Sequence, residues 1–160
     1  MLSIEIIAIG RLKPEEAKLE ARYLERLQKA GPSAGLKHIQ VKECPESKQA
    51  TASKRQQDET AKLVKNITPK SLIIALDETG QLQTSKNLAT KLGKLKDEGQ
   101  QTISFVLGGP DGHSQELKHT AHQSLSLSKL TLPHGLARIL LLEQLYRTTT
   151  LWQGHPYHRD

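Results

Sequence analysis

Apolar and polar residues alternate along this chain in blocks, and the period of the pattern changes from block to block. Short apolar runs rich in β-branched residues predict strands. These runs cover 2–10, 35–44, 71–80 and 102–112. Longer blocks with apolar residues at helical spacing predict helices over 13–31, 47–67, 84–99, 114–123 and 134–152. Gly31 and Pro32 are expected to end the first helix.

The regular alternation of strand and helix favours one α/β domain over residues 1–160, with a largely parallel sheet and helices on both faces. A clipped fifth strand and a loop are expected within 124–133. Ligands of such sheets bind beyond the carboxyl ends of the strands. Three segments fall there, "LDETG" after the third strand, "LGGPDG" after the fourth and "LSKLTLP" after the fifth. We therefore expect these three loops to form a cofactor pocket.

The last predicted helix is apolar around most of its circumference. Its apolar positions are Leu136, Ile139, Leu140, Leu141, Leu142 and Leu145. A helix of this kind is buried on several sides. One side is expected to pack on the sheet and another on a second copy of the chain, giving a homodimer. The alternative is a central core helix in a monomer.

Composition and charge narrow the class of protein. The chain is 36% hydrophobic and 25% charged, which is typical of a folded globular protein. Its net charge of +6 favours polyanionic partners such as nucleic acid, while only 3% aromatic residues disfavour a base-stacking platform. Cys44 is the single cysteine, and the chain shows neither a signal peptide nor a membrane-spanning run. These features predict a cytoplasmic protein that does not enter the membrane.

The glycine-rich segment 107–112 lacks the spacing of a dinucleotide fingerprint or a phosphate-binding loop. Gly108, Gly109 and Gly112 would allow close approach of a ligand, or form an ordinary tight turn. The histidine pairs His119/His122 and His155/His158 lack further ligands at metal-site spacing, so we expect no metal. No nucleophile-elbow pattern for an α/β-hydrolase occurs either.

Three stretches together resemble a known family. "FVLGGPDG" at 105–112, "SLSLSKLTLPH" at 124–134 and "HPYHRD" at 155–160 are similar to the ribosomal RNA large-subunit methyltransferase H family, of the SPOUT class. The resemblance implies an α/β fold with a C-terminal trefoil knot and a homodimer whose pocket is completed by the partner. It also implies methylation of N3 of a pseudouridine in large-subunit ribosomal RNA, using S-adenosylmethionine. Because a chain of 160 residues has little surface for reading a long RNA, we expect its substrate to be a preformed ribosomal surface.

Carried over by position, the resemblance assigns cofactor contacts to all three loops. They are Leu76, Gly108, Leu127, Ser128, Lys129, Leu130, Thr131 and Leu132. Lys129 departs from the small residue that the family often has, and Asp111 and Asp160 stand where glutamate is more usual. A backbone contact at Lys129 would tolerate that change.

The C-terminal "HPYHRD" supplies the candidate catalytic residues. The target N3–H is a weak acid that must lose its proton before the nitrogen attacks. His158 is expected to take or relay this proton, Arg159 to stabilise a uracil carbonyl or hold a phosphate, and Tyr157 to stack on the base. The alternative is that the tail only binds RNA or seals the dimer. Four further cations are candidates for phosphate contacts, namely Arg11, Lys129, Arg138 and Arg147.

Other function classes predict features that separate them from this interpretation. A Rossmann-type methyltransferase needs a glycine-rich loop after the first strand, where this chain has only "IGRLKPEE". A basic RNA-binding or ribosome-associated module without catalysis would not bind S-adenosylmethionine. A structural oligomer would tolerate loss of the last residues.

Overall fold

The structure is a computed structural model that describes residues 1–160. Five strands and five helices alternate along the chain. They are β1 (Leu2–Ile9), α1 (Pro14–Ala34), β2 (Leu36–Cys44), α2 (Ala52–Asn66), β3 (Leu72–Leu82), α3 (Ser85–Asp97), β4 (Thr102–Leu107), α4 (Gln115–Thr120), β5 (Gln123–Ser126) and α5 (His134–Trp152). None of the helices is both long and apolar enough to cross a lipid bilayer.

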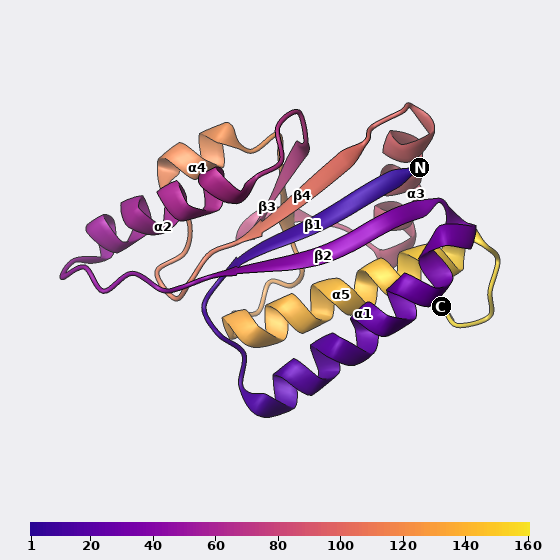
Figure 1. The fold of residues 1–160 in the computed structure, drawn as a ribbon, viewed down its shortest axis with the longest axis horizontal. Coiled ribbons are helices and arrows are strands. Elements are labelled where there is room, and N and C mark those ends of the chain that lie inside the picture. The colour runs from indigo at the N-terminus through magenta and orange to yellow at the C-terminus, as the bar shows by residue number, and fades with distance from the viewer.

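The five strands form one sheet in the order β2-β1-β4-β3-β5. Every pairing is parallel, so the carboxyl ends of all strands lie at one edge. Helices α2 and α4 cover one face, and α1, α3 and α5 cover the other (Figure 1). The predicted α/β architecture with helices on both faces is therefore confirmed.

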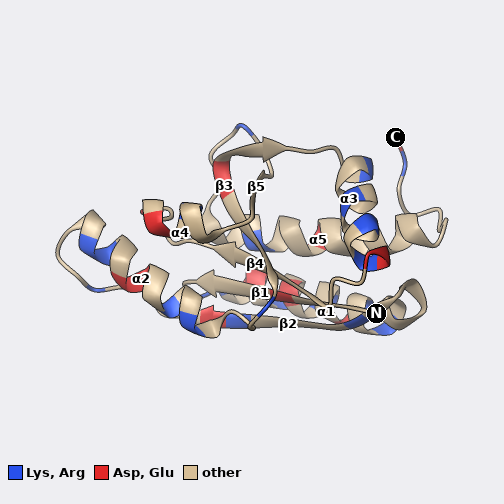
Figure 2. Ribbon diagram, turned by 90° about the horizontal axis from the view of Figure 1, so that it is seen from above, with Lys and Arg blue, Asp and Glu red and all other residues tan.

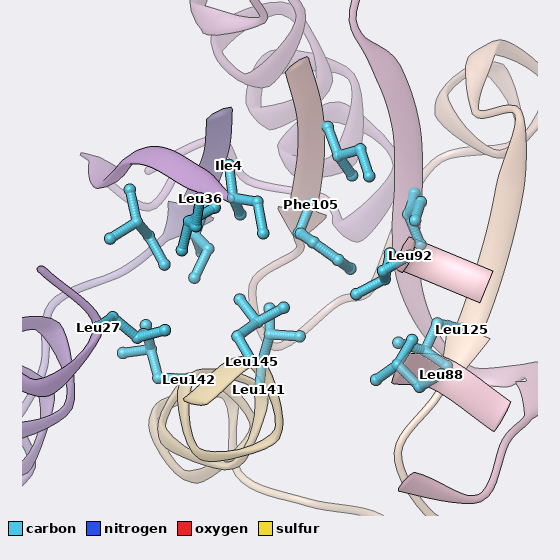
Figure 3. Packing of buried hydrophobic residues seen from close by; sticks show 14 of the residues in the cluster. Ile4, Leu27, Leu36, Leu88, Leu92, Phe105, Leu125, Leu141, Leu142 and Leu145 are labelled. Carbon is cyan, nitrogen blue, oxygen red and sulfur yellow. The ribbon is translucent and has the colours of Figure 1, made fainter. Parts of the chain in front are cut away.

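Residues of β1 alternate between two cores, because successive side chains of a strand point to opposite faces. Ile4 and Ile6 join the larger cluster, which contains Phe105 of β4 and leucines of α1, α3 and α5 (Figure 3). Ile7 and Ile9 join the smaller cluster under α2 and α4. Burial of each such side chain contributes about 1.5–3 kcal/mol. Because both faces of the sheet are buried, apolar residues are favoured at nearly every position of a central strand.

Helices α1 and α2 differ from the predicted bounds. Pro32 does not end α1, which continues to Ala34 and stops where Gly35 adopts φ 91°. The helix tolerates Pro32 because a proline removes only one backbone donor. The helix ends at Gly35, whose N–H donates to the Gly31 and Pro32 carbonyls. Helix α2 begins at Ala52 rather than at 47, because the Thr51 hydroxyl accepts from the Lys54 N–H (3.2 Å) as its N-cap.

Strand β3 departs from the prediction near its end. The segment expected to be a free loop, 76–80, is counted within the strand, which runs to Leu82. However, Leu125 of β5 pairs with both Leu76 and Gln81, so residues 77–80 bulge out of the ladder. A Cβ on Gly80 would lie 3.0 Å from the Leu125 backbone, and only glycine allows this close approach without displacement. The bulge places residues 77–79 on the wall of the cavity described below.

Helix α5 matches its predicted bounds and lies between α1 and α3 on the larger core. Leu141, Leu142 and Leu145 are buried, whereas Leu136 and Leu140 are 45% and 42% exposed. The helix is therefore apolar on two sides, of which one faces the core.

Two side chains fix the ends of this packing. The Trp152 indole N–H donates to the Ala89 carbonyl of α3 (2.8 Å). Arg138 is buried and pairs with Glu20 of α1 (2.5 Å) and Glu43 of β2 (2.9 Å). The prediction that Arg138 contacts phosphates is wrong, because two carboxylates of its own chain occupy the guanidinium.

Candidate functional site

A cavity of about 620 Å³ opens at the carboxyl ends of β3, β4 and β5, beside the N-terminal turn of α5. All three loops predicted from the fold class line it. The predicted residues on its wall are Leu76, Gly108, Leu127, Ser128, Leu130, Thr131 and Leu132. Lys129 is exposed and does not line it.

The loop 127–132 reaches the cavity with most of its backbone open. Side chains stabilise its shape, because the Ser126 hydroxyl donates to the Ser128 carbonyl (2.8 Å) and the Leu130 N–H donates to the Ser128 hydroxyl (2.9 Å). None of the backbone–backbone hydrogen bonds in turns and loops involves residues 127–132. Backbone donors and acceptors in an apolar wall suit a flat heteroaromatic ligand, which needs directed hydrogen bonds at its edge.

The glycine turn after β4 forms a second wall. Gly112 has φ 75° and donates its N–H to the Gly109 carbonyl (3.0 Å). A Cβ on Gly108 would lie 3.1 Å from the Gly112 carbonyl carbon and 3.2 Å from the His113 ring. The turn therefore folds tightly on itself at Gly108, and any larger side chain there has to displace it or enter the cavity.

Helix α2 holds this turn from outside. Arg55 binds the Asp111 carboxylate through two nitrogens (2.7 and 3.2 Å), and the Gln56 amide donates to the Asp111 carbonyl (2.7 Å). The hydroxyls of Thr60 and Ser114 share a hydrogen bond (2.6 Å) at the end of the turn. Bidentate guanidinium–carboxylate pairs add geometric specificity as well as energy. The α2 contacts thus preorganise a cavity wall.

Glu59 lies in the same α2 face and is 3% exposed. One carboxylate oxygen accepts from the Ser47 N–H (2.8 Å), while Oε1 has no hydrogen-bond partner. Burial raises the pKa of Glu59, and the nearby Asp111 charge raises it further. A Cβ on Gly109 would lie 3.1 Å from Oε1, so this carboxyl group packs directly against the glycine turn.

The bulge of β3 brings acidic side chains to the cavity. Asp77 Oδ1 accepts from both the N–H and the hydroxyl of Thr79 (3.0 and 2.9 Å), and Oδ2 pairs with Lys118 of α4 (3.3 Å). Burial alone would raise the pKa of Asp77, but these hydrogen bonds and the ammonium hold it below its usual value. Glu78 accepts from the Thr131 hydroxyl (3.1 Å) and so links the bulge to the loop 127–132.

His113 is a buried histidine on the cavity wall. Its Nε2 lies 3.2 Å from the Val106 carbonyl. Burial lowers the pKa of His113 below 6.5, so the ring is neutral near pH 7. No group of three or more His, Cys, Asp or Glu side chains is arranged to hold a metal ion.

The C-terminal tail, residues 153–160, lies outside the cavity. It reverses at Gly154 (φ 66°) and runs back along α5, ending beside α3 (Figures 1 and 2). The Tyr157 hydroxyl donates to Glu143 (3.3 Å), Arg147 contacts His158 Nδ1 (3.1 Å), and Asp160 pairs with Lys86 of α3 (2.5 Å). None of these tail residues lines the cavity.

Stacking strengthens this docked arrangement. The Tyr157 ring meets Tyr146 edge-on at 4.9 Å, and the Arg147 guanidinium lies 4.9 Å from the centre of the Tyr157 ring. Burial and the Glu143 carboxylate raise the pKa of Tyr157, which keeps its hydroxyl protonated. Arg159 is exposed. The Glu143–Arg147 ion pair of α5 therefore also anchors the tail.

The distance between the two regions follows from the helix that connects them. Ala137 lines the cavity and Glu143 anchors the tail, which places them about 9 Å apart along α5. The structure thus brings the three loops predicted to hold the cofactor together at one cavity, and leaves Tyr157, His158 and Arg159 outside it.

Arg55, Gln56, His113 and Lys118 belong to the site but were not predicted from the sequence. The available signal was the spacing of polar residues on α2, where 55, 56, 59 and 60 share one helix face. That spacing also fits an ordinary solvated face, so it does not by itself indicate a contact with a loop 54–56 positions further along the chain.

Comparisons with known proteins identify the family of the chain. A family model described as predicted SPOUT methyltransferase matches residues 2–158. Two similar curated proteins carry the name Ribosomal RNA large subunit methyltransferase H. One, from Allorhizobium ampelinum, is 43% identical over 99% of this chain and 100% of its own length. The other, from Sinorhizobium fredii, is 44% identical over 99% of each chain.

Solved structures support the fold at lower identity. A probable methyltransferase from Bordetella pertussis aligns with a TM-score of 0.55 and 14% identity, covering 91% of this chain and 95% of its own. A putative methylase family protein from Neisseria gonorrhoeae gives a TM-score of 0.51 at 16% identity, covering 90% and 81%. With the parallel sheet, the three converging loops and full-length relatives in agreement, the chain belongs to the SPOUT methyltransferases and, within them, to the ribosomal RNA large subunit methyltransferase H family.

Proposed function

We propose that this protein transfers a methyl group from S-adenosylmethionine to N3 of a pseudouridine in large-subunit ribosomal RNA. The observation that carries the proposal is the convergence of Leu76, Gly108 and the loop 127–132 on one cavity. The relatives named for ribosomal RNA methylation supply the substrate class. We place the activity in the cytoplasm, on the assembled ribosome, and the family's trefoil knot in the C-terminal segment from β4 to α5.

The residues of the cavity fit the proposed donor. Its volume of about 620 Å³ lies within the range of cofactor sites, roughly 300–1,000 Å³. The leucines of the loop 127–132 offer an apolar wall, and the open backbone groups there suit the edge of an adenine ring. S-adenosylmethionine, when bound, supplies a methyl group on a sulfonium sulfur, and this sulfur is the leaving group of an in-line displacement.

The tail would complete this site in trans. It is anchored about 9 Å along α5 from the cavity of its own chain. Leu136 and Leu140 form an exposed apolar strip on the same helix, beside the cavity. A second copy packed on this strip would cover apolar surface and bring its own tail close to the cavity. We therefore propose a homodimer with two composite sites.

In the composite site, the tail residues act on the RNA base. His158 would accept the N3 proton of the pseudouridine and pass it to water, which leaves N3 able to take the methyl group that the donor supplies. Arg159 stabilises the negative charge that develops on the uracil carbonyl. Tyr157, as a protonated hydroxyl, orients the base by stacking and hydrogen bonding.

A methyl-transfer assay tests the reaction. Free ribosomal RNA, isolated large subunits and whole ribosomes lacking the modification are incubated with the protein and S-adenosylmethionine. The expected product is one methyl group on N3 of a pseudouridine, located by mass spectrometry, with the highest yield on whole ribosomes. Methylation of another nucleotide, or binding to ribosomes without transfer, would contradict the proposal.

Subunit complementation tests the trans arrangement. Gly108→Val weakens donor binding, and a double variant with His158→Ala and Arg159→Ala removes the tail chemistry. At a donor concentration well below the one that half-saturates the wild type, each homodimer is expected to be nearly inactive. Refolding the two together should restore about a quarter of wild-type activity, because about half of the dimers carry one complete site. No recovery would mean that the tail acts on its own chain.

A further inference from the structure

One wall of the cavity carries a cation and an anion side by side. Lys118 of α4 is the only lysine or arginine among the cavity-lining residues. Its ammonium lies 3.3 Å from Oδ2 of Asp77, on the β3 bulge. The two side chains come from separate elements, α4 and β3, and form their ion pair at the cavity wall.

The other carboxylates of the wall are already engaged. Asp111 is held by both nitrogens of the Arg55 fork, and Glu78 accepts from the Thr131 hydroxyl. Asp77 uses Oδ1 for Thr79 and keeps Oδ2 toward Lys118. An ammonium has three donors, and Asp77 is the sole acceptor within ion-pair distance of Lys118. Lys118 therefore retains donors for a ligand.

The pair is also easy to open. The Lys118 side chain is 37% exposed, and an ion pair at this exposure contributes little to stability. Asp77 is 13% exposed and is fixed by Thr79, so its position does not depend on Lys118. A ligand can insert next to a preformed acid while a flexible lysine adjusts to it.

We propose that Asp77 and Lys118 bind the α-amino acid end of the methyl donor. The Lys118 ammonium binds the donor's carboxylate, and the Asp77 carboxylate binds its α-ammonium. This inference rests on the proposed use of S-adenosylmethionine. A zwitterionic group matches a paired cation and anion, whereas a lone charge in the cavity would match only half of it.

Two ligands that share an adenosine but differ in the amino acid test this assignment. S-adenosylhomocysteine carries the α-amino acid end, and 5′-methylthioadenosine lacks it. Calorimetry measures the affinity of each ligand for the wild-type homodimer and for Lys118→Met. We expect Lys118→Met to weaken S-adenosylhomocysteine about 10–100-fold, and 5′-methylthioadenosine less than about twofold. Lys118→Arg should retain most of the preference for S-adenosylhomocysteine.

Asp77→Asn probes the other half of the pair. It keeps an acceptor for Thr79 but removes the charge, so we expect a selective loss of about 3–30-fold for S-adenosylhomocysteine. Lys65→Met is the matched control, because Lys65 is an exposed lysine of α2 that does not line the cavity. It should leave both affinities unchanged.

Three results would overturn the inference. Equal weakening of both ligands by Lys118→Met would show a structural role for the pair, and unchanged binding of both would show no role. Failure of the wild-type protein to bind either ligand would remove the proposed donor as well. The ligand comparison thus separates failure of the subsite from failure of the proposed function.

Discussion

The cavity and the C-terminal tail differ in how one chain builds them. The cavity draws its walls from three loops of the same sheet edge, and α2 braces one of these loops from behind. The tail has the residues best suited to handle a proton, yet it lies on the second half of α5, outside those walls. One region is built within a single chain, whereas the other, in the arrangement proposed above, acts on the cavity of a second copy.

In the proposed arrangement, donor binding and methyl-transfer chemistry are therefore assigned to separate regions. Donor affinity should depend on the cavity residues and on their supports in α2, within one protomer. The rate of methyl transfer should depend additionally on the tail and on the assembly of two copies. Variants that affect one quantity and not the other are the sharpest tests of the division.

The largest effect is expected from the tail. The His158→Ala, Arg159→Ala double variant should lower the rate of methyl transfer about 10²–10⁴-fold, the range for loss of a general base. Its affinity for S-adenosylmethionine, measured by calorimetry, should change less than about threefold, because neither residue lines the cavity. A comparable fall in both quantities would break the division between the regions.

A large effect on donor affinity, rather than on the rate of methyl transfer, is expected at the glycine turn. Gly108→Val places methyl groups where a Cβ already approaches Gly112 and His113 within 3.1–3.2 Å. We expect donor affinity to fall about 10–100-fold, equivalent to about 1.4–2.8 kcal/mol. The melting temperature serves as the control. Unchanged affinity with a correctly folded protein would remove the turn from the donor site.

A smaller effect is expected from the brace on α2. Arg55→Lys retains the charge but loses the bidentate fit to Asp111. We expect the KM for S-adenosylmethionine to rise about 3–10-fold with little change in kcat, since about 1 kcal/mol of preorganisation is lost. Lys54→Ala, at an exposed neighbouring position, is the matched control. A fall in kcat alone would contradict the assignment.

The smallest effect concerns pH. The pKa of His113 is lowered by burial, so the unfolded chain binds this proton more readily than the folded one. Stability from the neutral ring is therefore present above pH 6.5 and decreases as pH falls below 6.5, with a slope of at most ~1.4 kcal/mol per pH unit. Urea unfolding of wild type and His113→Gln between pH 5 and about 8 should show a flatter profile in the variant, and parallel profiles would refute this.

The fold was largely predictable because its strands are buried on both faces. Such strands appear as short apolar runs, and the alternation with helices then limits the architecture to a parallel sheet. The errors occur where a single residue does not decide the outcome. Pro32 was tolerated in a last helical turn closed by Gly35, and the bulge after Leu76 depends on pairing with Leu125, which no local pattern contains.

The site was predictable to the extent that it is made of loops after strands. Parallel strands bring Leu76, Gly108 and the loop 127–132 to one edge whatever their separation in the chain. The brace by Arg55 and the pairing of Lys118 with Asp77 arise from tertiary packing of polar helix faces. Arg138 shows the reverse case, since a cation that looks available in the sequence is enclosed by Glu20 and Glu43.

The single tryptophan of the chain has a practical consequence. Trp152 closes α5, where its indole is bound to Ala89 and lies under the Lys96 ammonium at 4.5 Å. Fifteen helical residues, or about 22 Å, separate it from Ala137 at the cavity. Its fluorescence should therefore report selectively on melting of the α3–α5 contact. The same fluorescence should change little when the protein is titrated with S-adenosylmethionine.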